Sequence, residues 1–311
     1  MQRCPLVSFC VVTYNHENYI YQSLHSIVNC NFNFHFEILI GNDKSTDLTI
    51  NEIQRFQRDF PEINVVLVDR EINVGTNKNY LDLFSKSKGK YFLMLDGDDY
   101  LEFNDDSINL NQILLKSNSC VAFSYKFYYE VKNEFEKVII KDISLEKSLD
   151  GLFFHMSSVF FPKWIIDDIL NYHWIVKYNF LDRPLQINLI RDENKLFFSD
   201  TFMSVYRMHI NSQSKKMNNL EILDNVSHFL IDYYRHYKKS FKNFEKKVFK
   251  RRIYNNYILI LNPKNVISFG SYINKLKNDF TVLAKSVSYF FALKIVFTSL
   301  CLFTLKKCRF N

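Results

Sequence analysis

The chain has 311 residues, 47% of them hydrophobic, and a formal net charge of +7. That length can bury one large core, or a core with an appendage. Its six Cys form no Cys-x-x-Cys pair and no cluster with zinc-ligand spacing, which excludes a zinc-stapled protein and favours a reducing compartment.

The charge is unevenly distributed along the chain. Residues 1–220 hold 23 Lys and Arg against 28 Asp and Glu, a net charge of −5, whereas residues 221–311 hold 17 against 5, a net charge of +12. This asymmetry predicts that the C-terminal part meets an anionic surface. No nucleic-acid recognition motif accompanies the charge, so acidic lipid is favoured over nucleic acid.

Short apolar runs and helical patterns alternate in the first hundred residues. The runs are typical of buried parallel strands and lie at 6–12, 36–41, 64–68 and 91–95. Helices are predicted after the first three runs, at 17–30, 48–59 and 76–86. The first run is short and passes directly into polar residues, so we expect no secretory signal. The alternation predicts an α/β fold with an open, mostly parallel sheet and helices on both faces.

The remainder of the chain is less regular. Residues 120–210 predict shorter strands mixed with helices. Beyond residue 220 the pattern is helical, basic and aromatic. The longest apolar stretch, at 287–305, is interrupted by Lys294, which favours an interfacial helix over a membrane-spanning one.

Polar loops follow three of the predicted strands, at 13–16, 42–47 and 96–99. In open α/β sheets ligands bind outside the carboxyl ends of the strands, so these loops are expected to meet in one crevice. Asp96-Gly97-Asp98-Asp99 places three carboxylates at one strand end, where a cation would offset their repulsion. Such oxygen-rich sites suit Mg²⁺ or Mn²⁺ with a substrate diphosphate. The alternative interpretation is an acidic turn that caps the next helix.

Four motifs in this region resemble the family 2 glycosyltransferases of the GT-A fold. They occur in the family's order and at matching strand ends: Thr13-Tyr14-Asn15, Asn42-Asp43-Lys44-Ser45-Thr46-Asp47, Asn73-Val74-Gly75 and Leu95-Asp96-Gly97-Asp98-Asp99. The resemblance covers residues 5–101 and continues more faintly to about 212. One departure is Asn42, which stands where the family often has Asp.

The resemblance implies roles for individual residues. Asp43 would accept a hydrogen bond from the nucleobase, Asp96 would approach the ribose or the metal sphere, and Asp98 would bind the metal. Asp99 would assist or remain solvated. The other implied nucleotide-sugar contacts are Thr13, Tyr14, Asn15, Asn77, Gly97 and Arg207, and His209 is a second metal ligand. Turn and helix-capping chemistry is the alternative for Thr13, Asn15, Asp43 and Asp47.

The resemblance also implies a catalytic base in the acceptor half, an Asp near the start of a helix. Asp182 in Phe180-Leu181-Asp182-Arg183-Pro184 matches best, although Leu181 stands where the family often has a second acidic residue. Because Pro184 suits a first helical turn, the competing interpretation is that Asp182 only caps the helix. Asp167, Asp168 and Asp192 are alternative bases.

Together these features predict a metal-dependent, inverting glycosyltransferase at work in cell-surface polysaccharide synthesis. We expect a GT-A domain over 1–220, with a donor half to about 115 and an acceptor half from about 116, and a helical C-terminal region over 221–311. A UDP-sugar is the favoured donor, and a glycan or lipid-linked glycan is the acceptor. No Gln-x-x-Arg-Trp element occurs, so one sugar is expected per event. The expected location is the cytoplasm or the inner face of its membrane.

The competing function is a non-catalytic nucleotide-sugar binder, or an assembly partner in a glycan-building complex. It would keep Asp43 and the acidic cluster but would need no base. A dinucleotide-dependent enzyme is disfavoured, because the first strand is not followed by the Gly-x-Gly-x-x-Gly turn.

Overall fold

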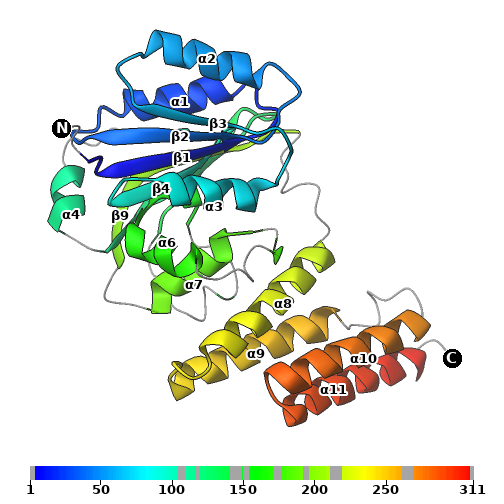
Figure 1. Ribbon diagram of the computed structural model, residues 1–311. Helices are drawn as coiled ribbons and strands as arrows, with labels where there is room; N and C mark the ends of the chain where they lie inside the picture. The colour runs from blue at the N-terminus through cyan, green and yellow to red at the C-terminus, as the bar shows by residue number, and fades with distance from the viewer. Residues whose placement is uncertain are drawn as a thin grey trace. The chain divides into compact units, whose positions relative to one another are not determined.

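The computed structural model (Figure 1) describes residues 4–103, 109–116, 119–140, 149, 154–170, 177–178, 180–191, 196–210, 219–260 and 269–308. Contacts divide the chain into two compact units, Met1–Ser212 and Gln213–Asn311. The sequence predicts this division between residues 220 and 221.

The first half of the N-terminal unit is a β-α-β alternation, as the apolar runs predict. Its elements are β1 (Val7–Thr13), α1 (Ile20–Asn29), β2 (Phe36–Asn42), α2 (Thr49–Asp59), β3 (Val65–Asp69), α3 (Thr76–Lys86) and β4 (Tyr91–Asp96). These four strands pair in parallel in the order β3-β2-β1-β4. All seven residues of β1 are buried, which explains why its sequence is a continuous apolar run rather than an alternating one.

The second half of this unit extends the same sheet. Its elements are β5 (Tyr100–Leu101), α4 (Leu110–Lys116), β6 (Cys120–Tyr129), β7 (Glu134–Val138), the short helix η1 (Met156–Ser158), β8 (Val159–Pro162), α6 (Lys163–Leu170), α7 (Asp182–Arg191) and β9 (Leu196–Met208). The sheet continues from β4 as β8-β6-β9-β5, and β7 pairs with β6.

One sequence prediction is wrong in this half. Strands shorter than the first four were expected after residue 120, yet β6 has 10 residues and β9 has 13, against 7 in β1. The two run parallel, with register shifts on either side of Ser124. Polar residues such as Ser124 and Lys126 interrupt the apolar run of β6, and that mixture hid its length.

Successive side chains of β1 point to opposite faces of the sheet and meet different helices. Val7, Phe9 and Val11 belong to the core shared with buried residues of α1 and α2, whereas Phe84 of α3 packs against Phe92 of β4 with ring centroids 4.8 Å apart. Figure 1 shows α1 and α2 together on one side of these strands and α3 on the other. The predicted α/β sheet with helices on both faces is therefore confirmed.

The C-terminal unit is helical in its described residues. It contains α8 (Asn219–Tyr237), α9 (Asn243–Ile260), α10 (Phe269–Ser286) and α11 (Tyr289–Cys308). Stacked aromatic rings join α8 to α9, as in Tyr233 and Phe249 with centroids 5.6 Å apart. Along α11, Phe291 and Thr298 both meet Tyr254 of α9. Within the described part of the chain, no helix has the length and apolar character that crossing a membrane requires.

Candidate functional site

Three polar loops leave neighbouring strands at one edge of the sheet. Thr13 pairs with Asn42 across β1 and β2, and Val12 pairs with Asp96 across β1 and β4. Beyond this level the backbone N–H of Gly97 donates to the carbonyl of Val12 at 2.8 Å. The parallel register therefore brings the loops at 13–16, 42–47 and 96–99 together, as the strand ends predict.

The first two loops are fastened to each other by side chains. Asn15 has a left-handed φ of 57°, and its Oδ1 accepts the N–H of Thr46 at 2.8 Å, while its own N–H donates to Ser45 Oγ at 2.9 Å. Asp47 Oδ1 accepts the N–H of Thr49 at 3.0 Å and so holds the start of α2. Asn15 and Asp47 therefore stabilise the turns of these loops through their hydrogen bonds.

The Asp43 carboxylate holds the loop that follows β3. It is only 4% exposed, and its two oxygens accept the N–H groups of Val74 and Gly75 at 2.7 and 2.8 Å. Asn73 donates back to the Asp43 carbonyl at 3.0 Å. Each carboxylate oxygen has a second lone pair, so Asp43 could accept a hydrogen bond from a nucleobase while it keeps its bonds to Val74 and Gly75.

The remaining strand-end residues differ in exposure. Thr13 is 2% exposed and lies beneath Gly97, whereas Tyr14 is 42% exposed. A Cβ added at position 97 would lie 2.8 Å from Thr13 Oγ1 and 3.0 Å from His16 Nδ1. Glycine at 97 is therefore required by the packing of the first loop against the acidic turn.

Asp98 makes the closest polar contacts of the acidic turn. Its Oδ2 lies 2.9 Å from Nε2 of His209, which follows β9, and 3.8 Å from Nε2 of His16. Burial by itself would raise the pKa of Asp98, but the hydrogen bond from His209 and the nearby imidazole of His16 bring it below its usual value. The structure thus joins the two predicted metal ligands, Asp98 and His209, in direct contact.

Asp96 lies in a different environment within the same turn. Its Oδ1 accepts the hydroxyl of Tyr80 at 2.8 Å. Burial, and then the negative charge of Asp98, raise the pKa of Asp96 to about 7. The two neighbouring carboxylates therefore differ in pKa, because the imidazoles beside Asp98 lower its pKa whereas burial and the Asp98 charge raise that of Asp96.

Asp99, which the sequence left between assistance and solvation, is 1% exposed. Its Oδ1 accepts the backbone N–H of Arg207 at 2.9 Å, and its Oδ2 lies 3.6 Å from Nε2 of His155. Burial followed by the charges of Asp98 and Asp96 raises the pKa of Asp99 well above its usual value. A buried side chain of this kind supports the turn from below and is not solvated.

The Arg207 guanidinium is bound inside the protein. Its Nε donates to the Asp98 carbonyl at 2.9 Å, its Nη2 donates to Gln22 Oε1 at 2.6 Å, and its Nη1 lies 3.6 Å from Glu130 Oε1. The residue is 7% exposed, with the rings of Tyr19, Tyr100 and Tyr128 around the guanidinium. A contact with a diphosphate would have to compete with these partners.

Asp182 is the first residue of α7 and is half-buried. Its Oδ1 accepts the N–H of Arg183 at 2.7 Å, which agrees with the helix-start interpretation. Burial raises the pKa of Asp182, and its charge in turn contributes to the raised pKa of Asp96. The two carboxylates are thus close enough to interact. Asn77 of α3 bonds to the carbonyl of Tyr178, just before this segment.

Of the other proposed bases, Asp167 is exposed on α6. The side chain of Asp168 and the whole of Asp192 lie outside the described residues. Sequence reasoning also missed residues that shape the site. His16 directly follows the Thr13-Tyr14-Asn15 motif, so its position was a usable signal. Tyr80 and Gln22 carry no such signal, because only the fold brings helical side chains to the strand ends.

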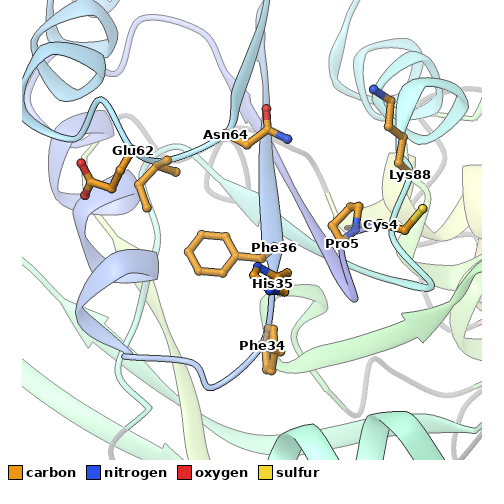
Figure 2. Close-up of a pocket in the computed structure, with 9 residues that line it drawn as sticks. Cys4, Pro5, Phe34, His35, Phe36, Glu62, Asn64 and Lys88 are labelled. Atoms are coloured by element: carbon orange, nitrogen blue, oxygen red, sulfur yellow. The ribbon is translucent and has the colours of Figure 1, made fainter. Parts of the chain in front are cut away.

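A separate surface cavity of about 590 Å³ lies at the opposite ends of these strands. Figure 2 shows Phe34, His35 and Phe36 near its centre, with Glu62 and Lys88 on either side. Its lining residues precede β1, β2, β3 and β4, apart from Phe36, which begins β2, so the cavity is remote from the polar strand-end loops.

The family model described as "Glycosyl transferase family 2" matches residues 8–258 of this chain. The chain belongs to that family. The resemblance that the four motifs carry is therefore confirmed.

Three curated relatives are similar over part of the sequence. An uncharacterized glycosyltransferase of Haemophilus influenzae is 34% identical over 124 residues, 34% of this chain and 35% of that protein. Abequosyltransferase RfbV of Salmonella typhimurium is 33% identical over 117 residues, 37% of this chain and 34% of that one. The putative teichuronic acid biosynthesis glycosyltransferase TuaG of Bacillus subtilis is 29% identical over 124 residues, 40% and 47% of the two chains. The chain thus spans about a third to a half of these relatives.

Two solved structures share the fold over most of the chain. TarS residues 1–349 of S. aureus has a TM-score of 0.64 at 15% identity and covers 90% of this chain and 81% of its own. Mannosyltransferase PcManGT of Pyrobaculum calidifontis, in complex with GDP-Man and Mn²⁺, has a TM-score of 0.53 at 11% identity, with 96% and 88% covered. At these identities the likeness concerns the fold alone.

The acidic turn and His209 offer side chains that could bind a divalent cation. Among the described residues, no group of three or more His, Cys, Asp or Glu side chains is arranged to hold a metal ion. Asp98 and His209 offer one carboxylate and one imidazole in contact. Two such ligands suit a Mg²⁺ or Mn²⁺ ion that takes its other ligands from a diphosphate and water. The donor set therefore fits a cation that is bound together with the substrate.

Proposed function

We propose that this glycosyltransferase moves one sugar per event from a nucleotide-sugar, with a UDP-sugar favoured, to a glycan or lipid-linked glycan acceptor. The proposed role is cell-surface polysaccharide synthesis, such as capsule, O-antigen or lipooligosaccharide. RfbV is named as an abequosyltransferase and TuaG as a putative teichuronic acid biosynthesis glycosyltransferase, and TarS has been solved with UDP and with UDP-GlcNAc. The observation that carries the proposal is the meeting of three polar strand-end loops around Asp98, with Asp182 close enough to Asp96 to affect its pKa.

The donor is proposed to lie over the carboxyl ends of β1, β2 and β4. The residues assigned to it are the nucleotide-sugar contacts that the resemblance implies, apart from Arg207: Thr13, Tyr14, Asn15, Asp43, Asn77, Asp96 and Gly97. Tyr14 is the most exposed of the first strand-end group, and Asp43 would act together with the loop that it holds. Arg207 is assigned the support of the acidic turn instead of a diphosphate contact.

A cation is proposed to bind through Asp98 and His209. When bound, it would neutralise the negative charge that develops on the departing diphosphate. The low pKa of Asp98 keeps its carboxylate charged and able to act as a ligand. The imidazole of His209 is held in place by its contact with that carboxylate.

Asp182 is proposed as the general base of a single displacement. The acceptor oxygen would form a bond to the anomeric carbon, the bond from that carbon to the diphosphate oxygen would break, and the acceptor proton would pass to Asp182. This displacement inverts the anomeric configuration. A carboxylate with a pKa raised by burial is a better proton acceptor than an ordinary Asp.

The base assignment is tested with Asp182→Asn. We expect nucleotide release from a panel of UDP-sugars and GDP-mannose, with Mn²⁺ present, to fall by about 10²–10⁴-fold, since that is the usual contribution of a general base. Donor-induced thermal shift should be unchanged, because the variant keeps the strand-end loops. Asp167→Asn, which changes an exposed carboxylate on α6, is the matched control. A variant that retains most of its activity would show that Asp182 only begins α7, and a wild type that binds donors without turnover would favour the non-catalytic binder.

The metal assignment is tested with Asp98→Asn and His209→Gln, with Mn²⁺ binding in the presence of UDP followed by electron paramagnetic resonance. We expect each variant to bind Mn²⁺ at least about tenfold more weakly, because each removes one of two protein ligands. Asp59→Asn, an exposed carboxylate on α2, should bind as the wild type does. Unaltered Mn²⁺ affinity in Asp98→Asn would refute the assignment.

The C-terminal unit is proposed to contact the inner face of the cytoplasmic membrane. The support is its net charge of +12 over residues 221–311, which favours an anionic lipid surface. Such a location would bring a lipid-linked acceptor to the enzyme.

A further inference from the structure

Helix α11 has apolar side chains on two faces, one buried and one largely exposed. On the buried face Ala292 and Ile295 are 0% and 1% exposed, and the polar Ser299 lies with them at 0%. Phe290 and Phe297 are 83% and 71% exposed. A helix that is apolar all round belongs in a protein core or against lipid, so the second face is the unusual one.

The exposed apolar side chains form a continuous stripe. Phe290, Leu293 and Phe297 follow the i, i+3, i+7 spacing that places side chains on one face of a helix, and Leu293 is 41% exposed. Single exposed apolar residues are ordinary on protein surfaces, but three aligned on one helix are not. We call these three residues the α11 stripe.

The charge of the surrounding unit indicates what covers the α11 stripe. Residues 221–311 have 17 Lys and Arg against 5 Asp and Glu, and Lys294 is exposed within α11 itself. A second copy of this unit would bring the same positive charge to the contact, which opposes self-association through this face. An anionic bilayer suits both the positive charge and the exposed apolar side chains, because its headgroups attract the Lys and Arg and its acyl boundary accepts the Phe side chains.

The contacts of α11 with α9 determine which side of α11 can meet lipid. Phe291 and Thr298 of α11 both meet Tyr254 of α9, at a ring-centroid distance of 6.4 Å and an oxygen distance of 3.1 Å. These contacts, two turns apart on α11, hold its inner side against α9 and leave the opposite side to meet lipid. Lys294 also interrupts the apolar run.

We infer that α11 lies in the plane of an acidic membrane surface, with Phe290, Leu293 and Phe297 inserted at the acyl boundary. This inference rests on the proposed membrane contact of the C-terminal unit and makes it specific. It adds an apolar insertion to a contact that charge alone could otherwise explain. The full-length protein would then bind acidic vesicles both by charge and by the α11 stripe.

The test is co-sedimentation of the full-length protein with vesicles of phosphatidylcholine containing about one third phosphatidylglycerol. The variant Phe290→Ser/Phe297→Ser removes the insertion and keeps every charge. We expect its partition coefficient to fall at least about tenfold, because apolar burial contributes strongly to interfacial binding. Val131→Ser removes an equally exposed apolar side chain from the N-terminal unit, at 77% exposure, and should bind as the wild type does. Circular dichroism melting would check that both variants fold.

A second measurement reports insertion directly. With acidic vesicles, Phe297→Trp should show a blue shift of emission and a quenching by brominated acyl chains beyond those of the wild type, which contains Trp164 and Trp174. Wild-type binding that Phe290→Ser/Phe297→Ser leaves unchanged would overturn the stripe and leave a charge-only membrane contact. If the wild type does not bind acidic vesicles, both the insertion of the α11 stripe and the proposed membrane contact are overturned. A wild-type dimer that the variant converts to monomer, or a variant that loses thermal stability but not vesicle binding, would show that protein covers the stripe. Donor turnover is scored separately and should be unaffected.

Discussion

At the scale of single residues, Arg207 shows how a polar side chain can serve the site from behind it. The Asp98 carbonyl, Gln22 and Glu130 surround its guanidinium, and its backbone N–H donates to Asp99. Arg207 therefore bonds to two successive residues of the acidic turn. Because the guanidinium fork is rigid and planar, it fixes the direction of the Asp98 carbonyl better than a lysine would.

We predict that Arg207→Met lowers the free energy of unfolding by about 2–4 kcal/mol, since it leaves buried acceptors without their charged donor. Weaker Mn²⁺ binding should accompany that loss, because the turn that bears Asp98 is no longer held. Arg207→Lys should restore part of the stability but less of the Mn²⁺ affinity. Urea unfolding and Mn²⁺ titration would measure the two effects. Arg55→Met, whose side chain is 47% exposed, should cost under about 1 kcal/mol. Equal losses in the Arg207 and Arg55 variants would contradict the role of Arg207.

At the scale of elements, the sequence predicts the donor half well because its strands are buried on both faces. Such strands appear as continuous apolar runs, and their polar ends locate the loops at 13–16, 42–47 and 96–99. What it cannot show is how elements approach one another. A Cβ on Gly41 of β2 would lie 2.0 Å from Asn79 Oδ1, and Asn79 of α3 donates to the Gly41 carbonyl and accepts from Arg70. The need for glycine at position 41 is therefore visible only once α3 is placed against β2.

The same limit applies to the candidate site. The motifs name Asp98 and His209, although 111 positions separate them, because each lies in a recognisable element. No motif indicates that Asp43 would be bonded to the Val74 and Gly75 amides, or that Tyr80 would donate to Asp96. These partners come from helices and loops whose positions depend on the whole sheet. Residue type and spacing thus locate the acidic turn, whereas packing determines which carboxylate is acidic and which is not.

At the scale of the whole molecule, the acidic turn makes folding depend on pH. Asp96 has an ordinary pKa of 3.8 and a folded pKa of about 7, raised by burial and by Asp98. The folded protein therefore binds this proton more tightly than the unfolded chain does. Its stabilising effect is fully present below about pH 4 and is lost as the pH rises through about 7. The folded protein without a cation should thus lose stability between pH 5 and pH 8.

We predict that Asp96→Asn removes the part of this loss that Asp96 causes, because the amide has no proton to release. Asp99 and Asp182, whose pKa values are also raised, keep their own parts. With divalent ions chelated, the difference in unfolding free energy between variant and wild type should grow by about 2 kcal/mol from pH 5 to pH 8. This figure is smaller than the full pKa difference would give, because Asp96 is only half-buried. Urea unfolding at the two pH values measures it, with Asp59→Asn as the exposed control. Parallel losses in Asp96→Asn and wild type would mean that other groups set the pH dependence. A cation bound at Asp98 offsets the same crowding of carboxylates, so added Mn²⁺ should stabilise the wild type more at pH 8 than at pH 5.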